Sequence, residues 1–120
     1  MIETELSRAA TKIVEELGRV QSGETVVVVT DADTVDVARS IATAARSVTD
    51  DVSILVKPAA KEHSNEPSGT VTAAMRAVDV ALVATRHSIT HTSAMGAILD
   101  SGTRVVTLRS ITTRMMREGG

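Results

Sequence analysis

Apolar residues recur along the chain at two alternating spacings, which predicts helices and strands in turn. In the first segment they stand three or four positions apart, the spacing of one stripe of an amphipathic helix. These residues are Leu6, Ala10, Ile13 and Leu17. Gly18 then follows as the expected residue at the helix C-terminus.

The segment Thr25–Thr30 is an uninterrupted run of β-branched residues, which is typical of a strand covered on both faces, as in a parallel sheet. Helical spacing then returns as far as Val48, with Asp33 or Thr34 as the expected N-cap. A strand over 52–56 is expected next, followed by an exposed loop over 57–67. A helix opened by Ser68 and reaching Val78 then precedes a strand over 79–85. The last expected elements are a helix capped by Ser88 and ended by Gly102, a strand over 104–108 and a short helix from Ser110.

Strands that alternate with helices are joined by right-handed crossovers into a parallel sheet. The predicted fold class is therefore α/β, a doubly wound (Rossmann-like or flavodoxin-like) parallel sheet of four strands in order 2-1-3-4, in three α/β/α layers. Residues 1–120 form a single domain on this prediction. Doubly wound domains usually carry about five or more strands. We therefore expect the chain to be a piece of a longer protein.

Composition narrows the possible partners. Hydrophobic residues make up 42% of the chain, but Phe, Tyr and Trp are absent, so no aromatic side chain can stack on a base. A net charge of −2 gives no basic surface for nucleic acid or an anionic membrane. The absence of cysteine excludes disulfides and thiolate metal sites. With no signal segment and no long apolar run, a cytoplasmic protein is expected.

The predicted strand order places a candidate binding crevice. Ligands of open parallel sheets bind beyond the carboxyl ends of the strands, where the strand order reverses. Here that point lies between the loops after the first and third strands. The candidate ligand-binding residues in these loops are Thr30, Asp31, Asp33, Thr85, Arg86, Ser88, Thr90 and His91. The alternative is that Asp33 and Ser88 only cap their helices.

The chemistry of the crevice suggests a peptide or an amino acid as ligand. The N-terminus of the fourth helix and Arg86 would favour a carboxylate. Asp31 would favour an amine or a hydroxyl. A ligand of this class carries both kinds of group.

Several common sites are disfavoured by what these loops contain. The turn after the first strand holds two carboxylates and no glycine, unlike a dinucleotide-binding turn. A phospho-acceptor receiver domain would need a carboxylate after the third strand and a lysine after the fourth, where Thr85 and Arg109 stand. His87 and His91 have a zinc-ligand spacing but lack a convincing third ligand. We therefore expect no metal, no cofactor and no catalytic residue in this chain.

Several segments together resemble the archaeal and bacterial proteins called leucyl aminopeptidase or aminopeptidase T. Ser88-Ile89-Thr90-His91-Thr92 is the most specific of them. The others are Lys12-Ile13-Val14, Gly23-Glu24 with Thr25–Asp31, Pro67, Ala73-Ala74-Met75, Ala77, Asp79-Val80, Thr85, Ala94, Gly102, Arg104-Val105, Ile111-Thr112 and Met115-Met116. That family is in turn similar to the dihydroxypyridine ring-cleaving dioxygenases, which have the same two-domain build.

The resemblance implies a metal-dependent parent enzyme, a hydrolase of the metalloprotease type that removes N-terminal amino acids from peptides, or a related dioxygenase. It places the divalent metal and its ligands in the C-terminal domain. This chain would then be a non-catalytic N-terminal domain that shapes the cleft and supports a homo-oligomer. The alternative hypothesis is a free-standing α/β module that binds a small ligand in its crevice.

Overall fold

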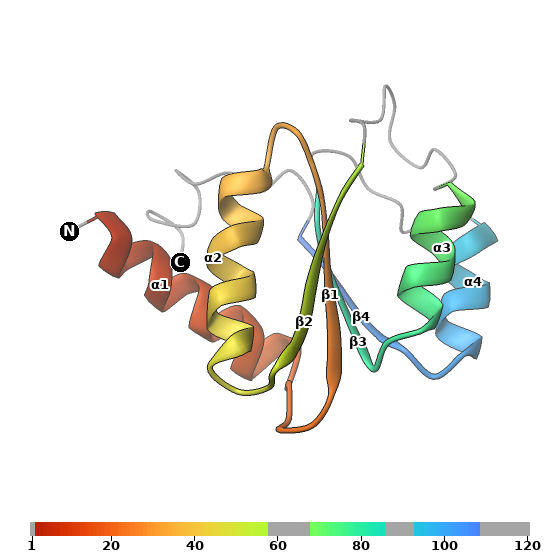
Figure 1. Cartoon of the computed structure of the whole chain (residues 1–120), viewed down its shortest axis with the longest axis horizontal. Coiled ribbons are helices and arrows are strands. Elements are labelled where there is room, and N and C mark those ends of the chain that lie inside the picture. The colour runs from red at the N-terminus through yellow and green to blue at the C-terminus, as the bar shows by residue number, and fades with distance from the viewer. Residues whose placement is uncertain (1, 58–67, 86–92, 109–120) are drawn as a thin grey trace.

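A computed structural model describes residues 2–57, 68–85 and 93–108 of the chain (Figure 1). Its helices are α1 (Ile2–Lys12), continued by one π-helical turn η1 (Ile13–Leu17), α2 (Val35–Arg46), α3 (Gly69–Arg76) and α4 (Ser93–Asp100). Its strands are β1 (Thr25–Asp31), β2 (Asp51–Lys57), β3 (Val80–Ala84) and β4 (Arg104–Thr107). The predicted alternation of helices and strands is confirmed.

The four strands form one sheet in the order β2-β1-β3-β4, and every neighbouring pair is parallel. In the register, Val28 of β1 lies between Ile54 of β2 and Leu82 of β3. The predicted parallel sheet with order 2-1-3-4 is therefore confirmed.

Helices cover both faces of this sheet, as the α/β/α prediction requires. Figure 1 shows α1 and α2 on one face and α3 and α4 on the other. Alternate residues of β1 serve the two layers, because successive side chains of a strand point to opposite faces. Val26 and Val28 belong to the core beneath α1 and α2, whereas Val27 and Val29 belong to the core beneath α3 and α4.

Burial separates the central strands from the edge strands. Every residue of β3 is buried, and so is all of β1 after Thr25, which explains the unbroken apolar runs in their sequences. The edge strand β2 differs, because none of its residues is fully buried. Ile54 is 41% and Val56 53% exposed. The apolar sequence of β2 therefore overstates its burial.

The end of the first helix departs from the prediction. Leu17 is 58% exposed and lies off the buried stripe, where Val14 is fully buried instead. The cause is η1: the Gly18 N–H bonds the Ile13 carbonyl at 2.9 Å, five residues back, so the chain turns through a smaller angle per residue than in an α-helix.

Gly18 does end the helix, but with a right-handed φ of −81°. Its neighbour Arg19 adopts the left-handed φ of 49°. The reason for glycine at 18 is space, since a Cβ there would lie 3.1 Å from Leu82 Cδ2.

Helix caps agree in part with the prediction. Ser68 caps α3 by accepting a hydrogen bond from the Val71 N–H at 3.2 Å. Gly102 follows α4 with a positive φ of 91°. Thr34 occupies the N-cap position of α2, but its side chain makes no capping bond. The proposed cap Ser88 and the last predicted helix lie outside the described residues. No helix of the described part is long and apolar enough to cross a membrane.

Candidate functional site

The strand order reverses between β1 and β3, which lie side by side. The helix that follows β1 is α2, whose Val37 packs in the core on one face. The helix that follows β3 is α4, whose Met95 packs in the core on the other face. The two helices therefore lie on opposite faces of the sheet. This geometry is the switch point that the predicted crevice required.

Thr34 is the polar centre of the described part of this switch point. Its hydroxyl lies 2.7 Å from the Ala84 carbonyl oxygen at the end of β3 and 2.9 Å from Asp31 Oδ1. The Thr30 hydroxyl lies 2.8 Å from it on the other side. A hydroxyl has one proton, so Thr34 donates to Ala84 or to Asp31 at any moment and accepts from Thr30. This network ties the ends of β1 and β3 together.

Asp31 shapes the turn from β1 into α2. Its carboxylate oxygen Oδ1 accepts the Asp33 N–H at 3.0 Å and stands beside the Thr34 hydroxyl. The Thr34 N–H in turn bonds the Asp31 carbonyl at 3.1 Å. A carboxylate held just before a helix start is stabilised by the positive end of the helix. The Asp31 carboxylate therefore occupies the position before α2 where a bound anion would otherwise lie.

The predicted site residues fall into three groups. Thr30, Asp31 and Thr85 come together at the carboxyl ends of β1 and β3 and are buried, with exposed fractions of 0, 0 and 1%. Asp33 is exposed in the turn before α2. The remaining candidates lie outside the described residues: Arg86, Ser88, Thr90 and His91. The binding role of the whole set stays a prediction.

Thr34 is the residue whose role the sequence pattern hid. It is 3% exposed and contacts both central strands, although its position suggested only a helix cap. The signal was present in the spacing. Two hydroxyls and a carboxylate within five residues of a strand–helix junction, at 30, 31 and 34, have the separations at which such side chains bond one another and the local backbone.

The opposite end of the sheet is also polar, and it includes a partly exposed ion pair. Arg104, at the start of β4, donates to both carboxylate oxygens of Glu24, at 2.6 and 2.9 Å, and to the Arg19 carbonyl at 3.1 Å. The Arg104 guanidinium, through these hydrogen bonds, lowers the pKa of Glu24, and Glu24 raises the pKa of Arg104. Asp79 accepts from the Thr25 N–H at 3.0 Å.

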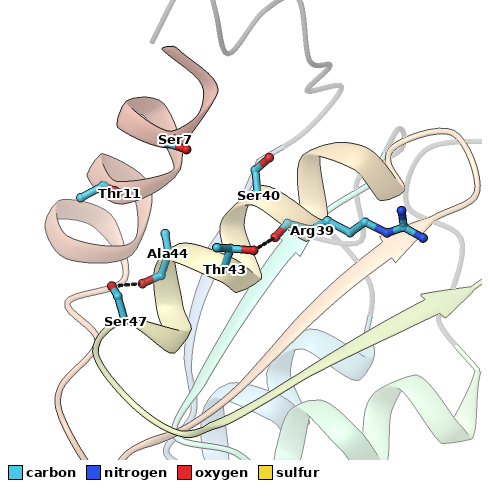
Figure 2. Close-up of a pocket in the computed structure, with 7 residues that line it drawn as sticks. All are labelled: Ser7, Thr11, Arg39, Ser40, Thr43, Ala44 and Ser47. Carbon is cyan, nitrogen blue, oxygen red and sulfur yellow. Dashed lines mark hydrogen bonds between the residues drawn. The ribbon is translucent and has the colours of Figure 1, made fainter. Parts of the chain in front are cut away.

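A groove of about 450 Å³ lies between α1 and α2, away from the switch point (Figure 2). It is lined by Ser7, Thr11, Arg39, Ser40, Thr43, Ala44 and Ser47. The α2 hydroxyls turn back to their own helix: Thr43 donates to the Arg39 carbonyl at 2.9 Å and Ser47 to the Ala44 carbonyl at 2.6 Å. Figure 2 shows the Arg39 guanidinium directed away from α1. The groove thus offers a ligand few available donors.

The described residues contain no group of three His, Cys, Asp or Glu side chains that could hold a metal ion. All three histidines, His63, His87 and His91, lie in the segments outside the description. Asp31 and Asp33 are two carboxylates without a third such group beside them in this part of the chain. No catalytic step through a metal is therefore assigned to these residues.

Comparisons with known proteins add a fold relationship. No family model matches the chain, and no curated protein matches its sequence. A solved structure, that of 2,5-dihydroxypyridine dioxygenase from Pseudomonas putida KT2440, superimposes with a TM-score of 0.70 at 18% sequence identity. The match covers 89% of this chain and 34% of that one.

At this identity the similarity shows the fold alone. The chain spans about a third of the dioxygenase. The comparisons thus support the dioxygenase side of the sequence resemblance at the level of the fold, and they give no support to the aminopeptidase side.

Proposed function

We propose that this domain is the non-catalytic N-terminal part of a two-domain metalloenzyme and forms one wall of its active-site cleft. The observation that carries the proposal is the fold match, which takes in 89% of this chain but 34% of a dioxygenase. A domain with this relation to a larger enzyme is suited to a supporting role. The divalent metal would be held by residues of another domain.

The wall in this proposal is the carboxyl edge of β1 and β3. Thr30, Asp31 and Thr34 form a buried network there, which fixes the edge without flexible side chains. A rigid edge orients a substrate at little conformational cost. The exposed Asp33 would be the described group best placed to meet a polar substrate or the second domain.

The two possible parents differ in support. A ring-cleaving dioxygenase is favoured by the structural neighbour. An aminopeptidase is favoured by the sequence resemblance alone, centred on residues 88–92. The same crevice would serve either, because an aromatic diol and a peptide both present hydroxyl, amine or carboxylate groups to Asp33 and the helix N-termini.

The gene and its full product test this proposal. We expect the reading frame to continue past codon 120 into a segment with carboxylate and histidine ligands. The full product should turn over either 2,5-dihydroxypyridine or an aminoacyl reporter when a divalent metal is added, and the 120-residue chain should turn over neither. Metal-dependent turnover by the 120-residue chain, lost in His91→Ala and kept in the control His63→Ala, would overturn the proposal.

A second candidate function is a free-standing module that binds a small polar ligand. The observation in its favour is the gathering of Thr30, Asp31 and Asp33 at the switch point. Amino acids and dipeptides titrated against the labelled chain should then shift the amide signals of residues 30–34 and 85–92. A stop codon directly after Gly120 together with such shifts would favour this module over the enzyme domain. An absence of shifts at millimolar ligand would remove it.

A further inference from the structure

The edge strand β2 leaves an apolar strip on the surface. Ile54 and Val56 are 41 and 53% exposed, and Val52 is half-buried. All three point to the face that carries α2, because Val52 pairs in register with Val26 and Ile54 with Val28, both of the core beneath that helix. Among the strands of residues 2–57, 68–85 and 93–108, none lies on the outer side of β2. In Figure 1 this edge faces the viewer.

Natural edge strands are usually protected by charges along their length. The centre of β2, residues 52–56, carries no charge. The other edge, β4, is shorter, and none of its residues is among the exposed large hydrophobic side chains of the described chain. The two edges are therefore not equivalent, and β2 is the one suited to pair with another strand.

The sequence of β2 is complementary to itself in one orientation. When two copies run antiparallel about Ile54, Val52 lies opposite Val56 and Asp51 lies opposite Lys57. A parallel arrangement in register would instead place Asp51 opposite Asp51 and Lys57 opposite Lys57, and like charges directly opposite one another are destabilising. The charges at the two ends of the strand thus select the antiparallel pairing.

We propose that two copies of this chain join along β2 into a twofold-symmetric, continuous eight-stranded sheet, with Ile54 facing its own counterpart on the axis. The twofold axis stands normal to the sheet, so the α2 helices of both copies lie on the same side. The strip formed by Val52, Ile54 and Val56 of each copy is then covered by the other. An isologous contact of this kind closes on itself and stops at a dimer.

The mass of the chain in solution is the first test. Light scattering should give a dimer for the wild type and a monomer for Ile54→Lys, because two ammonium groups would meet on the axis. Leu99→Lys is the matched control: Leu99 is 53% exposed on α4, far from β2 in the fold, and the variant should stay dimeric. A monomeric wild type, or a dimeric Ile54→Lys whose circular dichroism is native, overturns the proposal.

Disulfide cross-linking tests the register, and the absence of cysteine from the chain makes it unambiguous. Ile54→Cys should oxidise to a covalent dimer, because directly opposite Cα atoms of an antiparallel pair lie about 4.5–5.5 Å apart, within the range of a disulfide. Val56→Cys is the control: its two copies would stand about 13 Å apart along the strands and should not link. The double variant Val52→Cys with Val56→Cys should link. A dimer in which Ile54→Cys stays unlinked under oxidation contradicts this pairing.

Charge reversal tests the orientation. Asp51→Lys should weaken the dimer about tenfold, because two pairs of like charges are created across the axis. Adding Lys57→Asp to the same chain should restore the affinity. Failure of the second substitution to restore it would show that Asp51 and Lys57 do not face each other, and the antiparallel register would be wrong.

Discussion

The polar side chains at the two ends of the sheet find their hydrogen-bond partners in different ways. At the amino end, the polar side chains bond separate partners: Thr103, which is buried, bonds the Met75 and Val78 carbonyls, and the partly exposed Arg104 bonds Glu24. At the carboxyl end, the side chains of Thr30, Asp31 and Thr34 bond one another out of contact with water. Water can replace the exposed bond between Arg104 and Glu24, whereas a buried group that loses its partner keeps its desolvation cost.

This difference suggests that the two ends of the sheet have different roles. The amino end distributes its bonds over several loops, which is what a purely structural closure needs. The carboxyl end gathers a carboxylate and hydroxyls at one point, where the topology also opens the sheet. Loss of a single group should therefore matter more at the carboxyl end, and this expectation can be tested by graded substitutions.

The largest effect is expected from Thr34→Val, which keeps the shape of the side chain and removes its hydroxyl. The single Thr34 proton would no longer reach the Ala84 carbonyl or the Asp31 carboxylate, and the buried Thr30 hydroxyl would lose Thr34 as a partner, so the free energy of unfolding should fall by about 2–3 kcal/mol in urea denaturation. Thr43→Val, on the exposed side of the same helix, is the control and should change it by about 0.5 kcal/mol or less. A loss below that of the control would show that the network contributes nothing.

An intermediate effect is expected from Thr103→Val at the amino end. The Thr103 hydroxyl is 2.8 Å from the Met75 carbonyl and 2.9 Å from the Val78 carbonyl, and with one proton it donates to one of them at a time. Removal should cost about 1 kcal/mol in the same measurement. Thr107→Val, at the exposed last position of β4, is the control. A cost equal to that of Thr34→Val would break the contrast between the two ends.

The smallest effect concerns the pH dependence that Glu24 adds. Because the Arg104 hydrogen bonds lower its pKa in the folded chain, Glu24 stabilises the fold when ionised. That contribution is complete above the ordinary value of 4.5 and is lost as the pH falls through the lowered folded value. Solvent screens the pair, since the Arg104 side chain is 44% exposed, so about 0.5 kcal/mol is expected.

Glu24→Gln should remove this part of the acid sensitivity, measured as the difference from the wild type in thermal unfolding at a series of pH values. Glu15→Gln, at an exposed position of η1, should leave the curve of the wild type unchanged. A variant Glu24→Gln that still parallels the wild type below pH 4.5 would mean that the ion pair does not stabilise the fold.

Sequence reasoning predicted the topology well because the alternation of apolar runs with helical stripes leaves few parallel arrangements. It misjudged the residues whose surroundings depend on the assembled sheet. Val26 and Ile54 both stand in apolar strands, yet Val26 is 1% and Ile54 41% exposed, because β1 is central and β2 is at an edge. Nothing in the two short segments distinguishes these positions.

For the candidate site too, some features could be predicted from the sequence and others could not. The switch point followed from strand order, so the meeting of Thr30 and Asp31 with the end of β3 was foreseeable. The role of Thr34 was not, because its bond to the Ala84 carbonyl joins residues fifty positions apart. The close packing at Gly18 was hidden for a related reason, because the side chain that a Cβ there would meet, Leu82, lies on a strand distant in the chain.

The purely aliphatic cores on the two faces of the sheet have a spectroscopic consequence. With no Phe, Tyr or Trp, the chain neither absorbs nor emits appreciably in the near ultraviolet, so its own unfolding is silent to fluorescence. A single tryptophan in place of Leu17 or of Leu99, both exposed, would emit against no background. One would report on the layer of η1 and the other on the layer of α4. Superimposable denaturation curves from the two reporters would show that both layers melt in one cooperative step.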